Sequence, residues 1–179
     1  SNETCRSLLA LAFDDTVARS SDLTPVTATD PPQDSRAAEA PRFPVAGWDR
    51  YASVRFLGQG GMGQVFLAVD PRLHREVAIK FVRGDNPEHV RRLIAEARAQ
   101  ARVSHERVCK VHEVGEVEGK VYIAMQYIDG NPLGSLAGEL TVEQKVMLVR
   151  GAAEGLHAAH RAGIIHRDIK PGNVMLTQT

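Results

Sequence analysis

The chain has 179 residues, with 22 basic and 22 acidic side chains and therefore a formal net charge of zero. This length suffices for one domain with a sizeable core, or for a small domain plus a tail. A neutral balance favours neither nucleic acid nor an anionic membrane as partner, and no apolar run approaches the roughly 20 residues of a membrane helix. Cys5 and Cys109 lie far apart without metal-ligand spacing. We therefore expect a soluble, cytoplasmic protein without a disulfide framework or a zinc site.

The first part of the chain, residues 1–46, is rich in Pro, Ser, Thr, Asp and Ala. Residues 24–44 hold too few large apolar side chains for a core, which predicts a flexible N-terminal extension. Residues 6–13 could form one or two turns of amphipathic helix, and the apolar patch at 8–13 is a candidate docking spot.

From Trp48 onward the pattern changes, and it predicts strands at 51–57, 65–70, 76–83, 108–117 and 120–128. Short turns between the first three indicate an antiparallel sheet, whereas a doubly wound nucleotide fold needs a helix directly after the glycines. One helix interrupts the strands, with Asn86 as its N-cap and Pro87 in its first turn. Its expected apolar stripe consists of Val90, Leu93, Ile94, Ala97 and Ala101.

A helical part follows the breaker cluster at residues 129–132. Thr141 and Gln144 form a capping box that opens a long helix, which runs to about Ala162 and stops at Gly163. The residues expected on its buried face are Val142, Val146, Val149, Ala153 and Leu156. The sequence thus predicts five strands around one helix, followed by helices.

Two patterns in the strand region suit a nucleotide phosphate. Glycines at 58, 60, 61 and 63 form a hairpin whose backbone can approach phosphates closely, although tight flexible turns also carry glycines. In Val77-Ala-Ile-Lys80, alternation puts Ala78 and Lys80 on one side, where the small side chain leaves room for a flat ring and the lysine reaches the phosphates. A solvent-exposed edge lysine is the alternative.

Glu96 lies at the margin of the apolar stripe of the first helix. From that position it could pair with Lys80 and direct the ammonium toward the phosphates. The alternative is a surface carboxylate that pairs with Arg92, four residues earlier on the same helix.

The segment 164–175 carries the chemistry on which the other patterns depend. Apolar flanks hold Asp168, Lys170 and Asn173 on one short loop. A carboxylate to orient a hydroxyl, an ammonium to offset charge and an amide to hold a metal suit phosphoryl transfer, which depends on positioning more than on covalent chemistry. A solvated turn between two strands is the alternative.

Taken in order, the glycine loop, Val-Ala-Ile-Lys, the helix glutamate and His166-Arg-Asp168 with Asn173 resemble the eukaryotic-type (Hanks-type) protein kinase family. The segments 60–63 and 114–116 resemble its bacterial serine/threonine branch, and Lys170 favours serine/threonine over tyrosine kinases. The resemblance implies an α+β protein-kinase-like fold. Residues 47–128 would be a small lobe, a five-stranded antiparallel sheet with one main helix. Residues 129–179 would begin the helical large lobe and stop before its Asp-Phe-Gly segment.

The resemblance also implies ATP and Mg²⁺ as cofactors and a protein serine or threonine hydroxyl as substrate. Lys80 would contact the α- and β-phosphates with Glu96 as partner, Asp168 would be the catalytic base, Lys170 a γ-phosphate contact and Asn173 a magnesium ligand. The adenine would lie between the roof residues Leu57, Val65 and Ala78 and the floor residue Met175, beside the gatekeeper Met125 and the hinge backbones of Gln126 and Ile128. The glycine loop over the phosphates would comprise Gly58, Gly60, Gly61, Met62 and Gly63.

Gln100 departs from the family pattern, because this position is usually apolar; a polar group there either loosens the active arrangement or finds a hydrogen bond. The fragment alone is expected to lack kinase activity, and the exposed face of its long helix to need a partner or a second copy as cover. The longer protein could be anchored to a membrane by a later segment. A pseudokinase-like binding module and a small-molecule kinase are the alternative functions, and Lys170-Pro171 disfavours the second.

Overall fold

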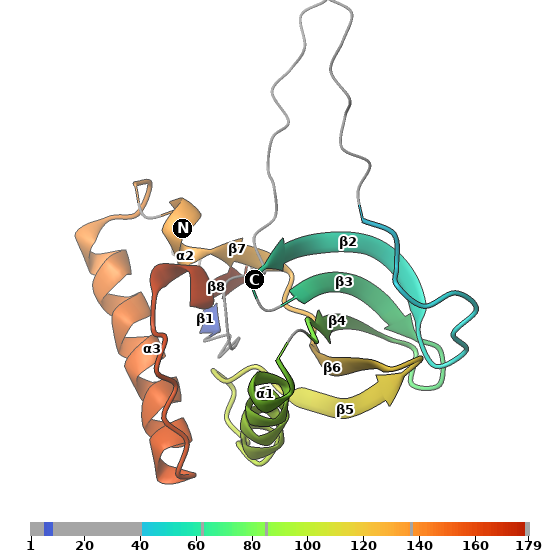
Figure 1. Cartoon of the computed structure of the whole chain (residues 1–179). Helices are drawn as coiled ribbons and strands as arrows, with labels where there is room; N and C mark the ends of the chain where they lie inside the picture. Colours follow the sequence, from blue (N-terminus) through green and yellow to red (C-terminus); the bar gives the residue numbers. More distant parts are fainter. Residues whose placement is uncertain (1–5, 9–40, 62, 85, 137, 178–179) are drawn as a thin grey trace, which may run out of the picture.

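The computed structural model describes residues 6–8, 41–61, 63–84, 86–136 and 138–177. Its main feature is an antiparallel five-stranded sheet with strand order β2-β3-β4-β6-β5. The strands are β2 (Ala52–Gly60), β3 (Gly63–Asp70), β4 (Arg75–Val82), β5 (Val111–Val117) and β6 (Lys120–Gln126). Figure 1 shows this curved sheet on one side of the molecule and the long helix α3 on the other. The five-stranded antiparallel sheet predicted from the sequence is confirmed.

The two faces of the sheet bury different sets of side chains, because successive residues of a strand point to opposite faces. On central β4, Val77, Ile79 and Phe81 join one apolar cluster, while Ala78 and Val82 join the other. Ala78 and Lys80 therefore share a face, as the alternation predicts.

Helix α1 (Pro87–Gln100) contributes to the cluster on the Ala78 face. The side chain of Asn86 accepts hydrogen bonds from the backbone N–H groups of Glu88 and His89, which confirms the predicted N-cap. The expected apolar stripe is partly wrong. The buried residues of α1 are Leu93, Ala97 and Gln100, whereas Ala101 is exposed.

The opposite face of the sheet is covered by the chain that precedes β2. The ring of Phe43 packs edge-on against Phe66 at a centroid distance of 5.2 Å, and Trp48 against Tyr122 at 4.7 Å. Val45 is buried in the same cluster. Packing of the sheet region thus begins at least four residues before position 47, the boundary expected from composition. The rest of the predicted extension, residues 1–5 and 9–40, lies outside the described residues.

A polar network fastens this covering segment to the sheet. The Arg50 guanidinium pairs with Asp70 at 2.8 Å and with Glu113 at 2.9 Å. The hydroxyls of Tyr51 and Tyr122 also donate to Glu113. Burial of Glu113 would raise its pKa, but these two hydroxyls and Arg50 outweigh burial and lower the pKa below its ordinary value.

The helical part contains β7 (Gly130–Pro132), α2 (Leu133–Leu136), α3 (Val142–Arg161), the 3₁₀ turn η1 (Pro171–Asn173) and β8 (Met175–Thr177). β8 lies between β7 and β1 (Arg6–Leu8) in a three-stranded antiparallel sheet. The amphipathic helix expected at residues 6–13 is therefore wrong for 6–8, where the backbone pairs with a distant strand. Residues 9–13 lie outside the described residues.

The capping box of α3 is confirmed, with Thr141 and Gln144 each bonding the backbone of the other. Its buried face differs from the expected one. The helix buries Leu148, Gly151, Gly155 and Ala159, because small residues allow close approach of the backbone. The valines expected to be buried, Val142, Val146 and Val149, are 61–70% exposed.

The sheet region contacts α3 through the turn after α1. Val103 and Val108 pack with Ala159, Ile164 and Val174 in a third apolar cluster. The Arg107 guanidinium also pairs with Glu154 of α3 at 3.0 Å. Within the described residues, no helix is both long enough and apolar enough to span a membrane.

Candidate nucleotide and phosphoryl-transfer site

The loop between α3 and β8 brings Asp168, Lys170 and Asn173 together. The ammonium of Lys170 lies 3.0 Å from Oδ2 of Asp168. The side-chain amide of Asn173 donates to the backbone carbonyl of Asp168 at 2.8 Å and to its Oδ2 at 3.2 Å. The three side chains of the predicted constellation are thus in mutual contact on one loop, although Lys170 and Asp168 remain 32% and 47% exposed.

The conformation of this loop has two further features, an unusual backbone angle at Arg167 and a hydrogen bond to the ring of His166. Arg167 adopts a φ of 65°, the left-handed region that is unfavourable for a residue with a side chain. The buried ring of His166 accepts the backbone N–H of Asp168 at Nδ1, 3.2 Å away. Burial lowers the pKa of His166, so the ring is neutral at pH 7 and Nδ1 is available as an acceptor. His166 thereby helps to fix the orientation of Asp168.

The charge state of Asp168 follows from its neighbours. The hydrogen bond from Lys170 is the largest cause that lowers the pKa of this carboxyl, and the bond from Asn173 acts in the same direction. The group is therefore an ionised acceptor at neutral pH. It can accept a hydrogen bond from a hydroxyl and orient it, which is the part that phosphoryl transfer requires of such a carboxylate.

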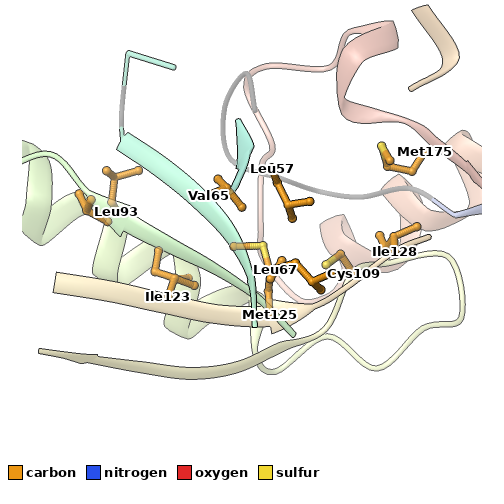
Figure 2. Packing of buried hydrophobic residues seen from close by; sticks show 12 residues of the cluster. Leu57, Val65, Leu67, Leu93, Cys109, Ile123, Met125, Ile128 and Met175 are labelled. Carbon is orange, nitrogen blue, oxygen red and sulfur yellow. The ribbon is translucent and has the colours of Figure 1, made fainter. Parts of the chain in front are cut away.

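The residues predicted to enclose an adenine belong to one apolar cluster. It comprises buried side chains from β2, β3, β4, β6, β8 and α1 and from the segments beside them, among them Leu57, Val65, Ala78, Met125, Ile128 and Met175. Figure 2 shows Leu57 and Val65 of the glycine hairpin in the same cluster as Met175 of β8, two residues after Asn173. Met175 is 1% exposed. Leu57 and Val65, predicted for the roof, and Met175, predicted for the floor, are about 110–120 positions apart in the sequence and lie in one cluster.

The glycine hairpin joins β2 and β3, with Gly60 paired to Gly63. Gly63 has a φ of 146°, and a Cβ there would lie 1.9 Å from the carbonyl oxygen of Phe81. Only glycine fits this position. At Gly61 a Cβ would meet no atom within 4 Å, so that position has open space. Gly58 lies on β2, and Met62 lies outside the described residues.

Lys80 and Glu96 are not joined in this structure. Lys80 is 5% exposed on β4, between Val65 of β3 and Ile123 of β6. Glu96 is half-buried on α1. Among the ion pairs between described residues, none connects these two side chains. The alternative pair of Glu96 with Arg92 is not among the ion pairs of the described residues either. The guanidinium of Arg92 instead contacts the ring of His89 at 3.3 Å.

The predicted hinge follows β6. The backbone N–H of Gln126 donates to the carbonyl of Lys110 at 2.8 Å, and its carbonyl accepts from the thiol of Cys109 at 3.6 Å. Tyr127, between Gln126 and Ile128, accepts a hydrogen bond from Arg55 of β2 at 3.1 Å. These contacts were missed from the sequence, because a thiol donor at 109, a backbone acceptor at 110 and an exposed arginine carry no motif.

The donor set can be tested against Mg²⁺. This ion prefers oxygen ligands and usually binds through one or two protein groups together with substrate phosphates. Asn173 uses its amide nitrogen toward Asp168, which leaves the amide oxygen, and the Asp168 carboxylate supplies further oxygens. In the described part of the chain, His, Cys, Asp and Glu form no cluster of three that would hold a metal by themselves. The residues therefore fit a magnesium ion shared with phosphates.

Fold and site together define the class of the protein kinases. Residues 51–179 match the family described as the protein kinase domain, and the chain belongs to that family.

Relatives with similar sequences are serine/threonine-protein kinases of mycobacteria. The chain is 38% identical over 151 residues to PknA of Mycobacterium tuberculosis (strain ATCC 25618 / H37Rv). This match covers 78% of the chain and 35% of PknA. It is 39% identical over 141 residues to PknB of Mycobacterium leprae (strain TN), covering 73% of this chain and 23% of PknB. The chain thus spans about a third or less of the length of these curated relatives.

Solved structures agree with this assignment. A crystal structure of the kinase domain of Mycobacterium tuberculosis PknI is 34% identical and superimposes with a TM-score of 0.65, covering 74% of this chain and 56% of that domain. Another crystal structure of the same domain gives a TM-score of 0.63 at 33% identity, with 71% and 54% covered. The bacterial serine/threonine kinase resemblance predicted from the motifs is confirmed.

Proposed function

We propose that this chain carries the nucleotide-binding lobe and the catalytic loop of an ATP- and magnesium-dependent protein serine/threonine kinase. One observation carries the proposal: the Asp168 carboxylate is held by Lys170 and Asn173 on the loop that leads directly into Met175, the predicted adenine floor. Catalytic carboxylate and nucleotide pocket are thereby connected by one short, bonded segment.

In the proposed reaction the ionised Asp168 accepts a hydrogen bond from the substrate hydroxyl and takes up its proton as the oxygen–phosphorus bond forms. The bond from the γ-phosphorus to the bridging oxygen breaks at the same time. Lys170 and Lys80 offset negative charge on the phosphates, and Asn173 contributes an amide oxygen toward the metal. Bound Mg²⁺ would supply charge neutralisation at the phosphates. The apolar cluster around Ala78 and Met175 keeps water from the adenine.

The proposal includes inactivity of the 179-residue chain by itself, because the chain covers 56% of the PknI kinase domain and not a whole one. Transfer of labelled γ-phosphate to a generic Ser/Thr protein substrate tests both parts. A longer protein that completes the domain should transfer phosphate, and Asp168→Asn should abolish transfer while the fold is kept. Transfer by the 179-residue chain, or full activity of Asp168→Asn, would contradict the proposal.

A pseudokinase-like binding module is the second candidate. The observation that favours it is Gln100, a polar side chain that is 2% exposed at a position where the family pattern has an apolar residue. A module of this kind would bind nucleotide or a protein partner without transferring phosphate. The same transfer assay on the longer protein decides between the two, since a module gives no labelled product under any metal or substrate condition.

A further inference from the structure

Gln100 is a polar side chain in an apolar environment. It is the last residue of α1, and it is 2% exposed on the helix face that also buries Leu93 and Ala97. Burial of an amide is unfavourable unless the amide is hydrogen-bonded, so its contact is expected to have a structural role.

That contact crosses the turn between α1 and β5. The amide nitrogen of Gln100 donates to the carbonyl oxygen of Cys109 at 2.9 Å. Inside the turn, the backbone N–H of Val103 donates to the Gln100 carbonyl, also at 2.9 Å. The side chain and the backbone carbonyl of Gln100 therefore both make hydrogen bonds within the connection between α1 and β5.

The acceptor residue reaches the predicted hinge. Cys109 belongs to the apolar cluster with Met125 and Ile128 (Figure 2), and its thiol donates to the carbonyl of Gln126 at 3.6 Å. Burial raises the pKa of this thiol to about 12, so it keeps the proton that it donates. The next residue, Lys110, accepts the backbone N–H of Gln126 at 2.8 Å.

We propose that Gln100 is a positioning residue of the nucleotide site, which ties the end of α1 to the hinge through the carbonyl of Cys109. The inference rests on the proposed function, because it takes Gln126 to be one of the two hinge residues whose backbones bond the adenine. Gln100 lies one helical turn after Glu96, and residues four apart share a helix face. One side-chain amide therefore links the helix that carries Glu96 to the strand end that presents the hinge.

The coupling has a direct consequence. If the Gln100 amide is removed, the Cys109 carbonyl loses this donor and the connection between α1 and β5 can shift. The carbonyl of Lys110, one residue further, is then less well placed for the N–H of Gln126. Loss of the Gln100 amide should therefore lower the affinity for the nucleotide as well as the stability of the domain.

Gln100→Met tests this, because methionine keeps the length and helix preference of glutamine and removes only the hydrogen bond. Val45→Ala is the matched control, since it removes buried atoms on the opposite face of the sheet. For both variants and the unmodified 179-residue chain, the measurements are the melting temperature, the dissociation constant of Mg-ATP by calorimetry, and hydrogen exchange at the Gln126 amide.

We expect Gln100→Met to weaken Mg-ATP binding by about 3- to 10-fold, the equivalent of one buried hydrogen bond. Exchange at Gln126 should become faster. Val45→Ala should lower the melting temperature and leave both of these readouts unchanged. Equal effects of the two variants on affinity or on exchange would overturn the inference.

Failure of the unmodified chain to bind Mg-ATP would refute the proposed function. The inference on Gln100 would then be decided by exchange alone. Faster exchange at Gln126 in Gln100→Met supports the link between helix and hinge, and unchanged exchange refutes it.

Discussion

Asp70 provides the sharpest test of how the sheet is held together. Its side chain is 0% exposed, and its Oδ1 accepts the backbone N–H groups of Arg72 at 3.0 Å and Leu73 at 3.2 Å. The same oxygen lies 2.8 Å from the guanidinium of Arg50. Burial alone would raise the pKa of Asp70, but Arg50 and these two N–H groups outweigh it and lower the pKa. Asp70→Ala removes all three contacts.

The expected loss of stability in Asp70→Ala depends on how well the charge of Arg50 is still compensated after the substitution. Breaking a buried ion pair costs about 3–5 kcal/mol when it leaves an uncompensated charge. Arg50 is 21% exposed and keeps Glu113 at 2.9 Å, so its charge is partly compensated. We therefore expect a loss of about 3 kcal/mol, the lower end of that range. At about 2–4 °C per kcal/mol for a chain of this size, the melting temperature should fall by roughly 6–12 °C.

Urea denaturation with a double-mutant cycle measures this prediction. The cycle uses Asp70→Ala, Arg50→Met and the double variant, and the two residues should couple by about 1–3 kcal/mol. Arg72→Ala is the control, because its exposed side chain is removed while its backbone N–H stays, and it should change stability by less than about 0.5 kcal/mol. A loss below about 1 kcal/mol for Asp70→Ala, or additive single variants, would refute the reasoning.

Two further predictions concern the glycine hairpin and pH. Gly63→Ala should cost about 2 kcal/mol or more, since a Cβ would lie 1.9 Å from the Phe81 carbonyl at a φ of 146°; Gly61→Ala, with open space around it, should leave the urea midpoint nearly unchanged. The free energy of unfolding should decrease on acidification. Burial lowers the pKa of His112 and His166 below the ordinary value of 6.5, so their contribution is complete above pH 6.5 and is lost as pH falls through the folded pKa. The pKa of Glu113 is likewise lowered from 4.5, so a second loss begins below pH 4.5, and Glu113→Gln should flatten it. A free energy of unfolding that increases as the pH falls from 7 to 4 would contradict these pKa directions.

Local patterns in the sequence predict much of the fold. Asn86 before Pro87 and the Thr141–Gln144 box define the starts of α1 and α3, because a cap depends on residues within three positions of each other. Alternation along β4 predicts that Ala78 and Lys80 share a face. Such short-range signals require no knowledge of the rest of the chain.

Features that depend on distant partners were not predictable in the same way. The strand at 6–8 exists through pairing with β8 at the other end of the chain. The buried face of α3 uses Gly151 and Gly155, which a search for large apolar residues overlooks although they allow the closest packing. Gln100 is unusual in the sequence, yet its acceptor is a backbone carbonyl, which no side-chain pattern reveals.

The site shows the same division. The constellation of Asp168, Lys170 and Asn173 was predictable, because all three lie within six residues on one loop. The pair of Lys80 and Glu96 depends on how α1 sits against the sheet, and this relation is set by packing along the whole helix. Lys80 lies on β4 and Glu96 on α1, and no ion pair between described residues connects them.

The central claim is that Lys80, Glu96, Asp168 and Asn173 serve one triphosphate. Calorimetric titration of the 179-residue chain with Mg-ATP and, separately, with adenosine tests it most directly. Lys80→Met should weaken binding of Mg-ATP by about tenfold or more and leave adenosine binding unchanged, because the ammonium is predicted to contact phosphates only. Lys120→Met, which removes a lysine that is 43% exposed on β6, is the control and should change neither affinity. Equal loss of both ligands in Lys80→Met, or Mg-ATP binding that does not depend on Lys80, would contradict the account.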